Sequence, residues 1–566
     1  MWRRMGRFHD KHPALVTGLA ATVLSCWVSW SLLSHLRSQT STDPDAALFV
    51  WSMAHAPHRL LGGHNPFVAT AIFATSGGAN LAYNATATLL GLLMWPVTSV
   101  AGPIAALNML TVLTPVTGTL AARRLLHVLT GRSGAAATLG AFVIGFSPFV
   151  LMHNGGRFQL AFQAIVLLLL AEAIIVARSY ARGQGLPRGR TLALGVLGGV
   201  QLWIGTEQLI IALLVGLLAG AGVLAAWSAD GPTRQRVPRA KRRDGATLGL
   251  AALGAVVVAA PFLTALLFGA ERYGGGYHQS ARSLFGLRLS NAFTATEATL
   301  IRSPLPLAVD RSSLSPFYAE DIGYLSVIGI AILMLVGVTW RRRSRLQRGA
   351  LVVALGCWVL ALGPTMRWSG MRWGVPGPWR LMELIPVLQE IIANRMFWGT
   401  FVCLGVIIAE VGSANRGTSD RPLRWACWAL ALLLFPAQYT QTRSVSAAAD
   451  TLVRQQCHGE LAVTLPQALE HEGMALQART DFAFDMYRGF AFRSSSLPKG
   501  DRLGIDDVAE RGTAANSAST IAIDELRSAG IGCVIVPASS LGTIEHLAMV
   551  LGAPMVAGDV AVWPHP

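Results

Sequence analysis

Long apolar runs, separated by short segments rich in arginine and lysine, recur through the first 440 residues of the chain. A helix of about 20 apolar residues crosses the hydrocarbon core of a bilayer, and most of these runs approach or exceed that length. Hydrophobic residues make up 52% of the 566 residues and charged residues only 13%, which is too apolar a balance for a soluble protein of this size. The sequence therefore predicts a polytopic membrane protein that is mainly α-helical.

The net charge of +16 would also suit nucleic-acid binding, but the basic residues lie in short segments between apolar runs. Arginine and lysine near the ends of membrane spans favour the cytoplasmic side, so each cluster predicts a cytoplasmic segment. The clusters lie at 3–11, 123–132, 178–190, 234–243, 341–348 and 416–424. This pattern indicates membrane topology rather than nucleic-acid binding.

Joining these cytoplasmic segments requires about eleven spans. The first run is longer than the apolar region of a signal peptide and lacks a clear cleavage site, so we expect it to be retained. The expected spans are near 13–36, 101–122, 134–152, 159–178, 191–206, 207–227, 246–268, 322–340, 349–364, 396–413 and 424–438. The odd number places the N-terminus in the cytoplasm and the C-terminus outside, and a composition rich in alanine, glycine and arginine indicates a bacterial plasma membrane.

The apolar stretch 82–100 does not fit this alternation, because a full span there would place Arg123 and Arg124 outside. It contains Pro96 and begins with polar residues. We predict a juxtamembrane or re-entrant helix, which surrounding protein can accommodate.

On this topology, polar and charged residues gather on the outer face. The first outer loop, 37–100, contains Asp43 and Asp45 in the string DPDAALFVW, followed by three histidines. The spacing of His55, His58 and His64 is loose and no matching cysteine or acid set is evident, so we interpret them as surface histidines on an amphipathic helix rather than a metal site. Later outer segments contribute His153, Asn154, Arg157, Glu207, Glu320, Asp321, Arg380 and Arg395, and Tyr324 lies at the start of the span that follows Asp321.

From about residue 441 the composition becomes mixed and polar. The strings IGCVIVP (531–537) and VAVWP (560–564) predict short buried strands, and ELAVTLPQALE and TIAIDELRSAG predict a strand or helix between them. We expect a transmembrane domain over 1–440 and a small extracytoplasmic α/β domain over 441–566. Cys457 and Cys533 lie in the latter; an oxidising compartment would permit a disulfide, although the sequence does not place them within reach.

The order of these features resembles the GT-C superfamily of membrane glycosyltransferases that use polyprenyl phosphate sugars, in particular a bacterial branch of it. The strings that carry the resemblance are, in chain order, DPDAALFVW, GGHNPF, GFSPFVLMHNGGRFQL, QLWIGTEQLI, AEDIGYLSVIGI and WRLMELIPVL with NRMFW after it. The resemblance covers nearly the whole chain. It implies transfer of a hexosyl or pentosyl group from a polyprenyl phosphate carrier to a glycan, lipid or protein of the cell envelope. No soluble cofactor motif is present, and a divalent cation at the site is left open.

Transfer by a single displacement needs a carboxylate that accepts the proton of the acceptor hydroxyl, and cations that stabilise the departing lipid phosphate. The resemblance assigns the carboxylate to Asp45, because its pattern of an aromatic residue four positions and a tryptophan six positions after the acid matches Phe49 and Trp51. Asp43 is the close alternative, since Pro44 holds both carboxylates in one short turn. A structural interpretation also stays open, in which the DPD string caps a helix.

The other candidates are assigned to substrate binding. Glu207 separates two apolar runs, and carboxylates in a membrane usually serve function, although a pair with an arginine at the outer boundary would explain it too. Arg395 begins a span from the outer side, which favours phosphate binding as much as a surface salt bridge, and Arg380 is a weaker candidate for the same role. Glu320 and Asp321 suit either a helix N-terminus or a cation and acceptor site.

Arg157 stands where proteins of the resembled family tend to carry histidine, although a guanidinium can also bind phosphate. His153, Asn154 and Tyr324 complete the substrate-binding set. Two other classes remain open: a transporter or lipid flippase, whose polar residues would line a pathway, and an inactive scaffold that binds envelope glycans. Against the transporter, the sequence shows no repeated halves, and the candidates gather on one face.

Overall fold

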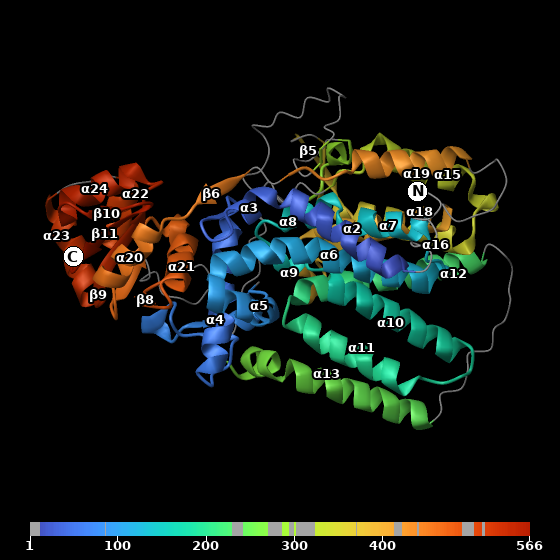
Figure 1. Cartoon of the computed structure of the whole chain (residues 1–566), viewed down its shortest axis with the longest axis horizontal. Coiled ribbons are helices and arrows are strands. Elements are labelled where there is room, and N and C mark those ends of the chain that lie inside the picture. Colours follow the sequence, from blue (N-terminus) through green and yellow to red (C-terminus); the bar gives the residue numbers. More distant parts are fainter. Residues whose placement is uncertain are drawn as a thin grey trace.

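The computed structural model shows a helical bundle joined to a C-terminal segment, residues 441–566, that contains a mixed β-sheet (Figure 1). The structure describes residues 12–84, 86–228, 242–269, 286–293, 299–300, 323–368, 371–411, 421–438, 441–489, 503–511 and 516–566. The C-terminal segment lies at one end of the bundle, and helix α4 (Pro44–Leu61) stands between the two.

The long helices of the bundle coincide with the apolar runs of the sequence. They are α2 (Pro13–Val28), α6 (Pro103–Thr130), α7 (Ala135–Gly145), α10 (Ala164–Ala181), α11 (Arg188–Leu202), α12 (Thr206–Ser228), α13 (Arg242–Phe268), α15 (Ser326–Val338), α16 (Arg345–Ala361), α18 (Phe397–Val411) and α19 (Arg421–Leu433). Each interval predicted as a span overlaps one of them. Whether all of them cross a membrane, and so the total of about eleven spans, stays a prediction.

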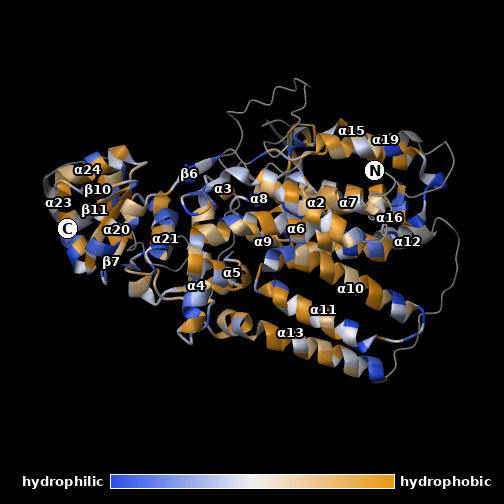
Figure 2. Ribbon diagram, viewed as in Figure 1, coloured by the Kyte–Doolittle hydropathy of each residue, from blue (hydrophilic) through white to orange (hydrophobic). Residues whose placement is uncertain are grey.

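Five helical stretches of the described residues are long and apolar enough to cross a membrane. They are Pro103–Thr130, Ala135–His153, Phe158–Ala181, Arg243–Phe268 and Ala393–Val411. Figure 2 shows hydrophobic residues along α10, α11 and α13 and hydrophilic residues near their right-hand ends. This distribution is that of a multi-pass membrane protein.

Glycines let helices α7 and α18 approach closely. A Cβ atom added to Gly140 of α7 would overlap the backbone carbonyl oxygen of Gly405 in α18, and one added to Gly405 would lie 2.6 Å from the Ile144 side chain. Because lipid supplies no hydrophobic force that drives helices together, membrane helices associate through such small-residue contacts. Helices α6, α7, α16 and α18 thereby share one buried core.

Short elements connect the long helices, mostly at the end of the bundle nearest the C-terminal segment. They are α3 (Trp30–Ser34), β1 (Gln39–Ser41), β2 (Val68–Ala69), η1 (Ala74–Ser76), β3 (Ala79–Asn80), η2 (Leu81–Tyr83), α5 (Thr88–Ala101), α8 (Pro148–His153), α9 (Phe158–Ala161), η3 (Leu289–Ala292), η6 (Trp340–Arg342), β4 (Thr365–Trp368), β5 (Met371–Pro376), α17 (Trp379–Met382), η7 (Pro386–Glu390), η8 (Ala393–Met396) and β6 (Thr442–Ser444).

Helix α5 corresponds to the apolar stretch that did not fit the alternation of spans. It has 14 residues and contains Pro96, so its length of roughly 21 Å falls short of the hydrocarbon core of about 30 Å. Its assignment as a juxtamembrane or re-entrant helix rather than a span stays a prediction.

The C-terminal segment contains a five-stranded sheet of order β10-β11-β9-β7-β8. The central strand β9 (Ile531–Pro537) and the terminal strand β11 (Val560–Pro564) lie where the apolar strings predicted strands. Strand β9 is parallel to β7 (Leu461–Thr464), which is parallel to β8 (Asp485–Met486), whereas β11 is antiparallel to β9 and to β10 (Met555–Ala557). The helices are α20 (Ala447–Gln456), α21 (Glu470–Arg479), α22 (Gly504–Arg511), α23 (Asn516–Ser528) and α24 (Leu541–Leu551), and η10 (Gln467–Leu469) precedes α21.

Cys457 and Cys533 form a disulfide, with their Cα atoms 5.6 Å apart. The bond joins the C-terminal end of α20 to β9, the central strand of the sheet. The sequence permitted a disulfide between these two cysteines without predicting one, and the structure contains it. The division into domains at residue 440 and the extracytoplasmic placement of the segment stay predictions.

Candidate active site

The start of helix α4 is built by the DPD string. Asp43 is the N-cap residue, and its Oδ1 accepts a hydrogen bond from the Asp45 backbone N–H over 2.9 Å. Pro44 follows at the first helical position, where its missing N–H costs nothing, and Asp45 lies in the first turn, where the helix dipole favours a negative charge. The structural interpretation of the string is therefore confirmed, and it leaves the Asp45 side chain available for another partner.

That partner is Arg157, which lies far away in the sequence. Arg157 Nε donates a hydrogen bond to Asp45 Oδ2 over 2.8 Å, and the side chains are 7% and 26% exposed. The neighbouring Gly156 packs on the other carboxylate: a Cβ atom there would lie 2.6 Å from Asp43 Oδ1. A single loop thus contacts both acids, although Arg157 was only a weakly supported candidate in the sequence.

Burial is the largest influence on the pKa of Asp43. Desolvation by burial is the largest effect and raises the pKa of Asp43 above its usual range, and the negative charge of Asp45 acts in the same direction. The positive charges of Arg157 and His153, together with the cap hydrogen bond, lower the pKa and only partly offset this. Asp43 is therefore a desolvated acid that caps the helix, whereas Asp45 is 26% exposed and bound to Arg157.

Two buried side chains, His153 and Asn154, anchor the loop that contains Gly156 and Arg157. His153 is fully buried, and its Nδ1 lies 2.8 Å from the Phe149 carbonyl oxygen. Asn154 is fully buried too, and its Nδ2 donates to the Thr111 carbonyl oxygen over 2.7 Å. The Asn154 Oδ1 is buried with no hydrogen-bond partner among the described residues. These contacts fix the backbone that presents Gly156.

A second acid and arginine pair lies at the start of α12. Glu207 forms a salt bridge with Arg395 of η8, and its Oε1 accepts a hydrogen bond from the Ile392 backbone N–H over 3.4 Å. The Arg395 side chain is 6% exposed. Glu207 is thus paired with an arginine, as one of the two interpretations expected, and in this pair the arginine is buried while Glu207 is 21% exposed.

The single turn of α9 connects the two pairs. Arg157 is its N-cap residue, and at its other end the Leu160 carbonyl oxygen accepts a hydrogen bond from Gln208 Nε2 over 2.8 Å. Gln208 follows Glu207 in the chain, so this hydrogen bond ties the turn that begins at Arg157 to the start of α12. Gln159 of the same turn is buried, and its Oε1 has no hydrogen-bond partner among the described residues.

The remaining candidates are placed differently. Tyr324 is buried in the main core, just before α15. Arg380 is exposed on the one-turn helix α17, and none of its described contacts is with either ion pair. Glu320 and Asp321 lie outside the described residues.

The prediction for the histidines of the first outer loop was wrong in one case. His58 and His64 are exposed, but His55 is only 2% exposed. The reason is tertiary: the C-terminal segment covers the face of α4 that carries His55. Among the residues that the structure describes, no group of three or more His, Cys, Asp or Glu side chains could hold a metal ion.

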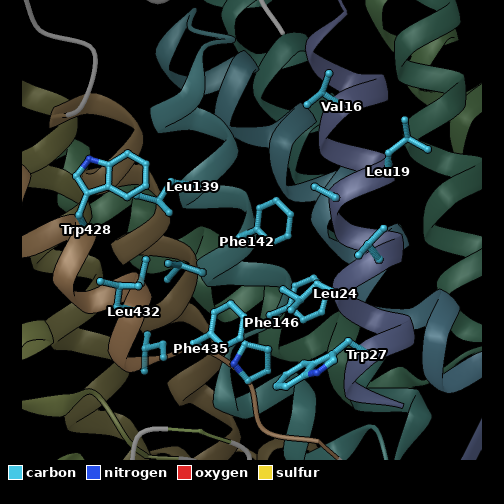
Figure 3. A pocket seen from close by; sticks show the side chains of 16 residues that line it. Val16, Leu19, Leu24, Trp27, Leu139, Phe142, Phe146, Trp428, Leu432 and Phe435 are labelled. Carbon is cyan, nitrogen blue, oxygen red and sulfur yellow. The ribbon is translucent and has the colours of Figure 1, made fainter. Parts of the chain in front are cut away.

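An apolar groove of about 850 Å³ runs between α2, α7 and α19. Figure 3 shows aromatic side chains around it, which are Trp27, Phe142, Phe146, Trp428 and Phe435. One wall, α2, continues through α3 into β1, and another, α19, continues into β6. Because β1 pairs with β6, with Gln39 opposite Ser444, both walls lead to the residues just before Asp43.

Sequence reasoning missed Gly156 and Gln159. The pair of adjacent glycines in HNGGR was a usable signal, since glycine permits close backbone approach. Nothing in the local sequence marked Gln159, because its burial and its Oε1 without a described hydrogen-bond partner come only from the tertiary packing.

Comparisons with known proteins bear on the fold. No family model matches the chain, and no curated protein matches it. Among solved structures, the archaeal oligosaccharyltransferase AglB from Archaeoglobus fulgidus, in complex with an inhibitory peptide and a dolichol phosphate, is similar with a TM-score of 0.53 and 12% identity over 96% of this chain and 71% of that chain. The arabinofuranosyltransferase AftD from Mycobacteria is similar with a TM-score of 0.52 and 13% identity over 98% of this chain and 40% of that chain.

These likenesses concern architecture, because the identities are too low to carry residue roles across. They extend over nearly the whole chain in both comparisons. Both solved proteins are membrane glycosyltransferases of the GT-C type. The chain therefore has the GT-C fold, as the resemblance of its sequence predicted.

Proposed function

We propose that the chain is a membrane glycosyltransferase that moves a sugar from a polyprenyl phosphate carrier to an extracytoplasmic acceptor of the cell envelope. The observation that carries the proposal is the start of α4, where two carboxylates and Arg157 meet within a GT-C fold. The similar protein AglB was solved with a dolichol phosphate, which supports a lipid-linked donor here.

Asp45 is the base in this proposal. Its side chain is 26% exposed and so open to an acceptor, whereas Asp43 uses an oxygen to cap α4. Asp45 accepts the proton of the acceptor hydroxyl while the hydroxyl oxygen attacks the anomeric carbon of the sugar. The bond from that carbon to the phosphate oxygen breaks, and polyprenyl phosphate leaves with the electron pair. A positioned base accelerates such a step by about 10²–10⁴-fold.

Arg157 has two roles in this scheme. Its salt bridge orients the Asp45 carboxylate before the substrates arrive. A guanidinium can also bind phosphate oxygens with two parallel hydrogen bonds, so we also assign Arg157 to the charge that develops on the departing phosphate. Asp43 remains the alternative base, because its raised pKa brings it nearer to the range in which a carboxylate accepts a proton efficiently.

The second ion pair is assigned to substrate binding. Arg395 is a buried cation paired with Glu207, and we assign it to the donor phosphate. Glu207, its partner, is assigned to a hydroxyl group of the sugar or the acceptor. His153, Asn154 and Tyr324 keep their assignment to substrate binding, and Arg380, Glu320 and Asp321 stay as predicted contributors.

The groove between α2, α7 and α19 suits the tail of the lipid carrier. Its lining is almost wholly apolar, and from Val16 to Trp27 it follows α2 for roughly 17 Å. Its walls lead to β1 and β6 beside Asp43. A carrier in the groove would thus have its phosphate directed toward the two acids.

The test is sugar transfer by the purified protein in nanodiscs, with a panel of radiolabelled polyprenyl phosphate sugars and envelope extracts as acceptors. We expect transfer by the wild type, a loss of at least about 10²-fold in Asp45→Asn, and full activity in Asp524→Asn, which changes an exposed acid of α23. Unchanged transfer in a folded Asp45→Asn variant would move the role to Asp43. No transfer by the wild type across the panel, with lipid or solute movement in liposomes, would favour a transporter instead.

A further inference from the structure

Helix α21 of the C-terminal segment packs along α4, the helix that begins with the two acids (Figure 1). One side chain, Gln477, makes most of the polar contact. Its Oε1 accepts a hydrogen bond from Trp51 Nε1 over 2.9 Å, and its Nε2 donates to the carbonyl oxygens of Ala71 and Phe484, both over 2.8 Å. Gln477 and Trp51 are fully buried. A single amide therefore joins α4, the first outer loop and the C-terminal segment.

Aromatic rings extend this contact. The Trp51 and His55 rings are stacked with their centroids 4.0 Å apart, and the Phe482 ring lies 6.2 Å from the His55 ring and 4.4 Å from the His58 ring. Phe482 has a φ of +55° and its neighbour Asp481 a φ of +59°. Residues other than glycine rarely adopt this backbone conformation, and it persists where surrounding contacts enforce it. The turn is therefore held in the shape that places Phe482 against α4.

The sheet of the C-terminal segment is also closed off by the first outer loop. Strand β8 is an edge strand, and the Met486 backbone N–H donates to the Ala71 carbonyl oxygen over 2.8 Å. A Cβ atom at Gly489 would lie 2.9 Å from the Ile72 side chain, so the loop is tightly packed there. The loop thus covers a strand edge that would otherwise expose unpaired backbone groups.

We propose that the C-terminal segment is a clamp that positions the candidate acids, with Trp51 and His55 on α4, and Gln477 and Phe482 on the clamp, as the positioning residues. Trp51 lies six residues after Asp45, a rise of roughly 9 Å along the same rigid helix. A tilt or rotation of α4 at Trp51 therefore moves Asp45 relative to Arg157, which is held by the bundle. The effect on catalysis rests on the proposed function, whereas the docking itself does not.

The protonation of His55 supplies an independent signature. Burial, followed by the charges of Arg59 and His58, lowers the pKa of His55 to about 3, and a backbone hydrogen bond with Pro66 acts weakly the other way. Among the described residues, Arg59 and His58 are the groups whose charges act on His55. The C-terminal segment contacts His55 through the Phe482 ring. An undocked α4 would expose His55 and return its pKa to about 6.5. Docking is therefore at full strength above about pH 6.5 and weakens as the pH falls below it.

The first experiment measures docking by hydrogen exchange of full-length protein in nanodiscs, in peptides from 44–61 and 470–486, between pH 7 and pH 5. After correction for intrinsic exchange, protection in the wild type is expected to fall by about 30-fold at pH 5, because 1.5 pH units separate that pH from the pKa of the undocked imidazole. His55→Phe keeps an aromatic ring but cannot titrate, so it should lose this pH dependence. His58→Phe changes an exposed histidine and should retain it.

A pH dependence that persists in His55→Phe, or its absence in the wild type, would refute the role of His55. Exchange in α6 and α18 reports whether each variant has folded, and a His55→Phe variant that fails this check is replaced by His55→Tyr, with the same expected result.

The second experiment separates positioning from stability. Trp51→Phe removes the hydrogen bond to Gln477 at the clamp, and the control Trp563→Phe removes a bond of 2.7 Å to the Gly552 carbonyl oxygen within the C-terminal segment. We expect Trp51→Phe to lower kcat at least about tenfold with KM within about twofold, since it misplaces the base without removing a substrate contact. Trp563→Phe should leave kcat unchanged. Equal losses of kcat in both variants would show that the segment acts through stability alone. If the wild type transfers no sugar, the proposed function fails while the exchange results still decide the docking.

Discussion

Replacing Gly156 by alanine tests whether the loop at Arg157 sets the position of the two acids. A Cβ atom at Gly156 would lie 2.6 Å from Cγ and Oδ1 of Asp43 and 3.0 Å from the backbone nitrogen of Ala46. Ordinary van der Waals contact with a Cβ atom begins at 3.4 Å, so the start of α4 or the loop must shift by about 0.8 Å. The carboxylates cannot give way freely, because Asp43 caps the helix and Asp45 is bound to Arg157.

The magnitude follows from that shift. A misplacement of about 1 Å at an active site costs on the order of 10²-fold in rate, which corresponds to about 2.7 kcal/mol of barrier. Overpacking lowers stability by about 1–3 kcal/mol, and the variant remains folded if total stability lies in the usual range of about 5–15 kcal/mol. We therefore expect kcat/KM of Gly156→Ala to fall by roughly 10²-fold with a modest loss of thermal stability.

The assay compares sugar transfer and thermal unfolding in the wild type, Gly156→Ala and a control, Gly189→Ala. The control adds the same methyl group in α11, where no heavy atom lies within 4 Å; it should leave transfer unchanged and should not lower thermal stability, because alanine favours a helix over glycine. Gly156→Ala with at least half the wild-type kcat/KM would refute the reasoning, because the acids would then tolerate displacement by the loop.

Three further outcomes follow from other contacts. Asp43→Asn should raise the thermal stability at neutral pH, because burial raises the pKa of Asp43: its favourable contribution is complete below the unfolded pKa of about 3.9 and is lost as the pH rises through the folded value, while asparagine still caps α4. Unfolding between pH 3 and 8 checks this, and a stability gain that does not shrink toward low pH would contradict it. Loss of the disulfide in Cys457→Ser with Cys533→Ser should destabilise the C-terminal segment by about 2–5 kcal/mol; proteolysis should then cut residues 441–566 sooner than the bundle, and unchanged resistance would oppose the prediction. Arg488→Met removes a buried guanidinium that binds Asp506 over 2.7 and 2.8 Å and Glu470 over 2.9 Å, which should cost about 3–5 kcal/mol in a denaturant titration of the segment. Replacing all three residues by apolar ones of similar size should recover most of it, and a triple variant no more stable than Arg488→Met would count against a buried charge as the cause.

The start of α4 shows how much of the candidate site was determined by the local sequence. An aspartate at the N-cap, a proline at the first helical position and a second aspartate in the first turn satisfy the helix terminus within three residues. The sequence could therefore place both acids beside a helix start. It could not decide between a cap and a catalytic role, and the structure shows that Asp43 serves as the cap while Asp45 is bound elsewhere.

His55 shows the opposite case. Its loose spacing from His58 and His64 predicted a surface position, and that is true of the other two. His55 is buried because Phe482, more than 400 residues later in the chain, covers its ring. No pattern within α4 carries that information, since an amphipathic helix indicates which face is covered but not what covers it.

The sequence by itself determined the apolar helices, the basic segments between them, strands β9 and β11 of the C-terminal segment and the helix start at Asp43. These features depend on hydrophobic length, periodicity and capping, which act over a few turns of chain. Only the tertiary structure decided which acid pairs with which arginine and what covers α4. Asp45 and Arg157 are 112 residues apart, Glu207 and Arg395 188, and Trp51 and Gln477 426. The physical reason is that each such contact depends on how several packed helices bring their ends together, and that arrangement minimises the free energy of the whole chain rather than of any one segment.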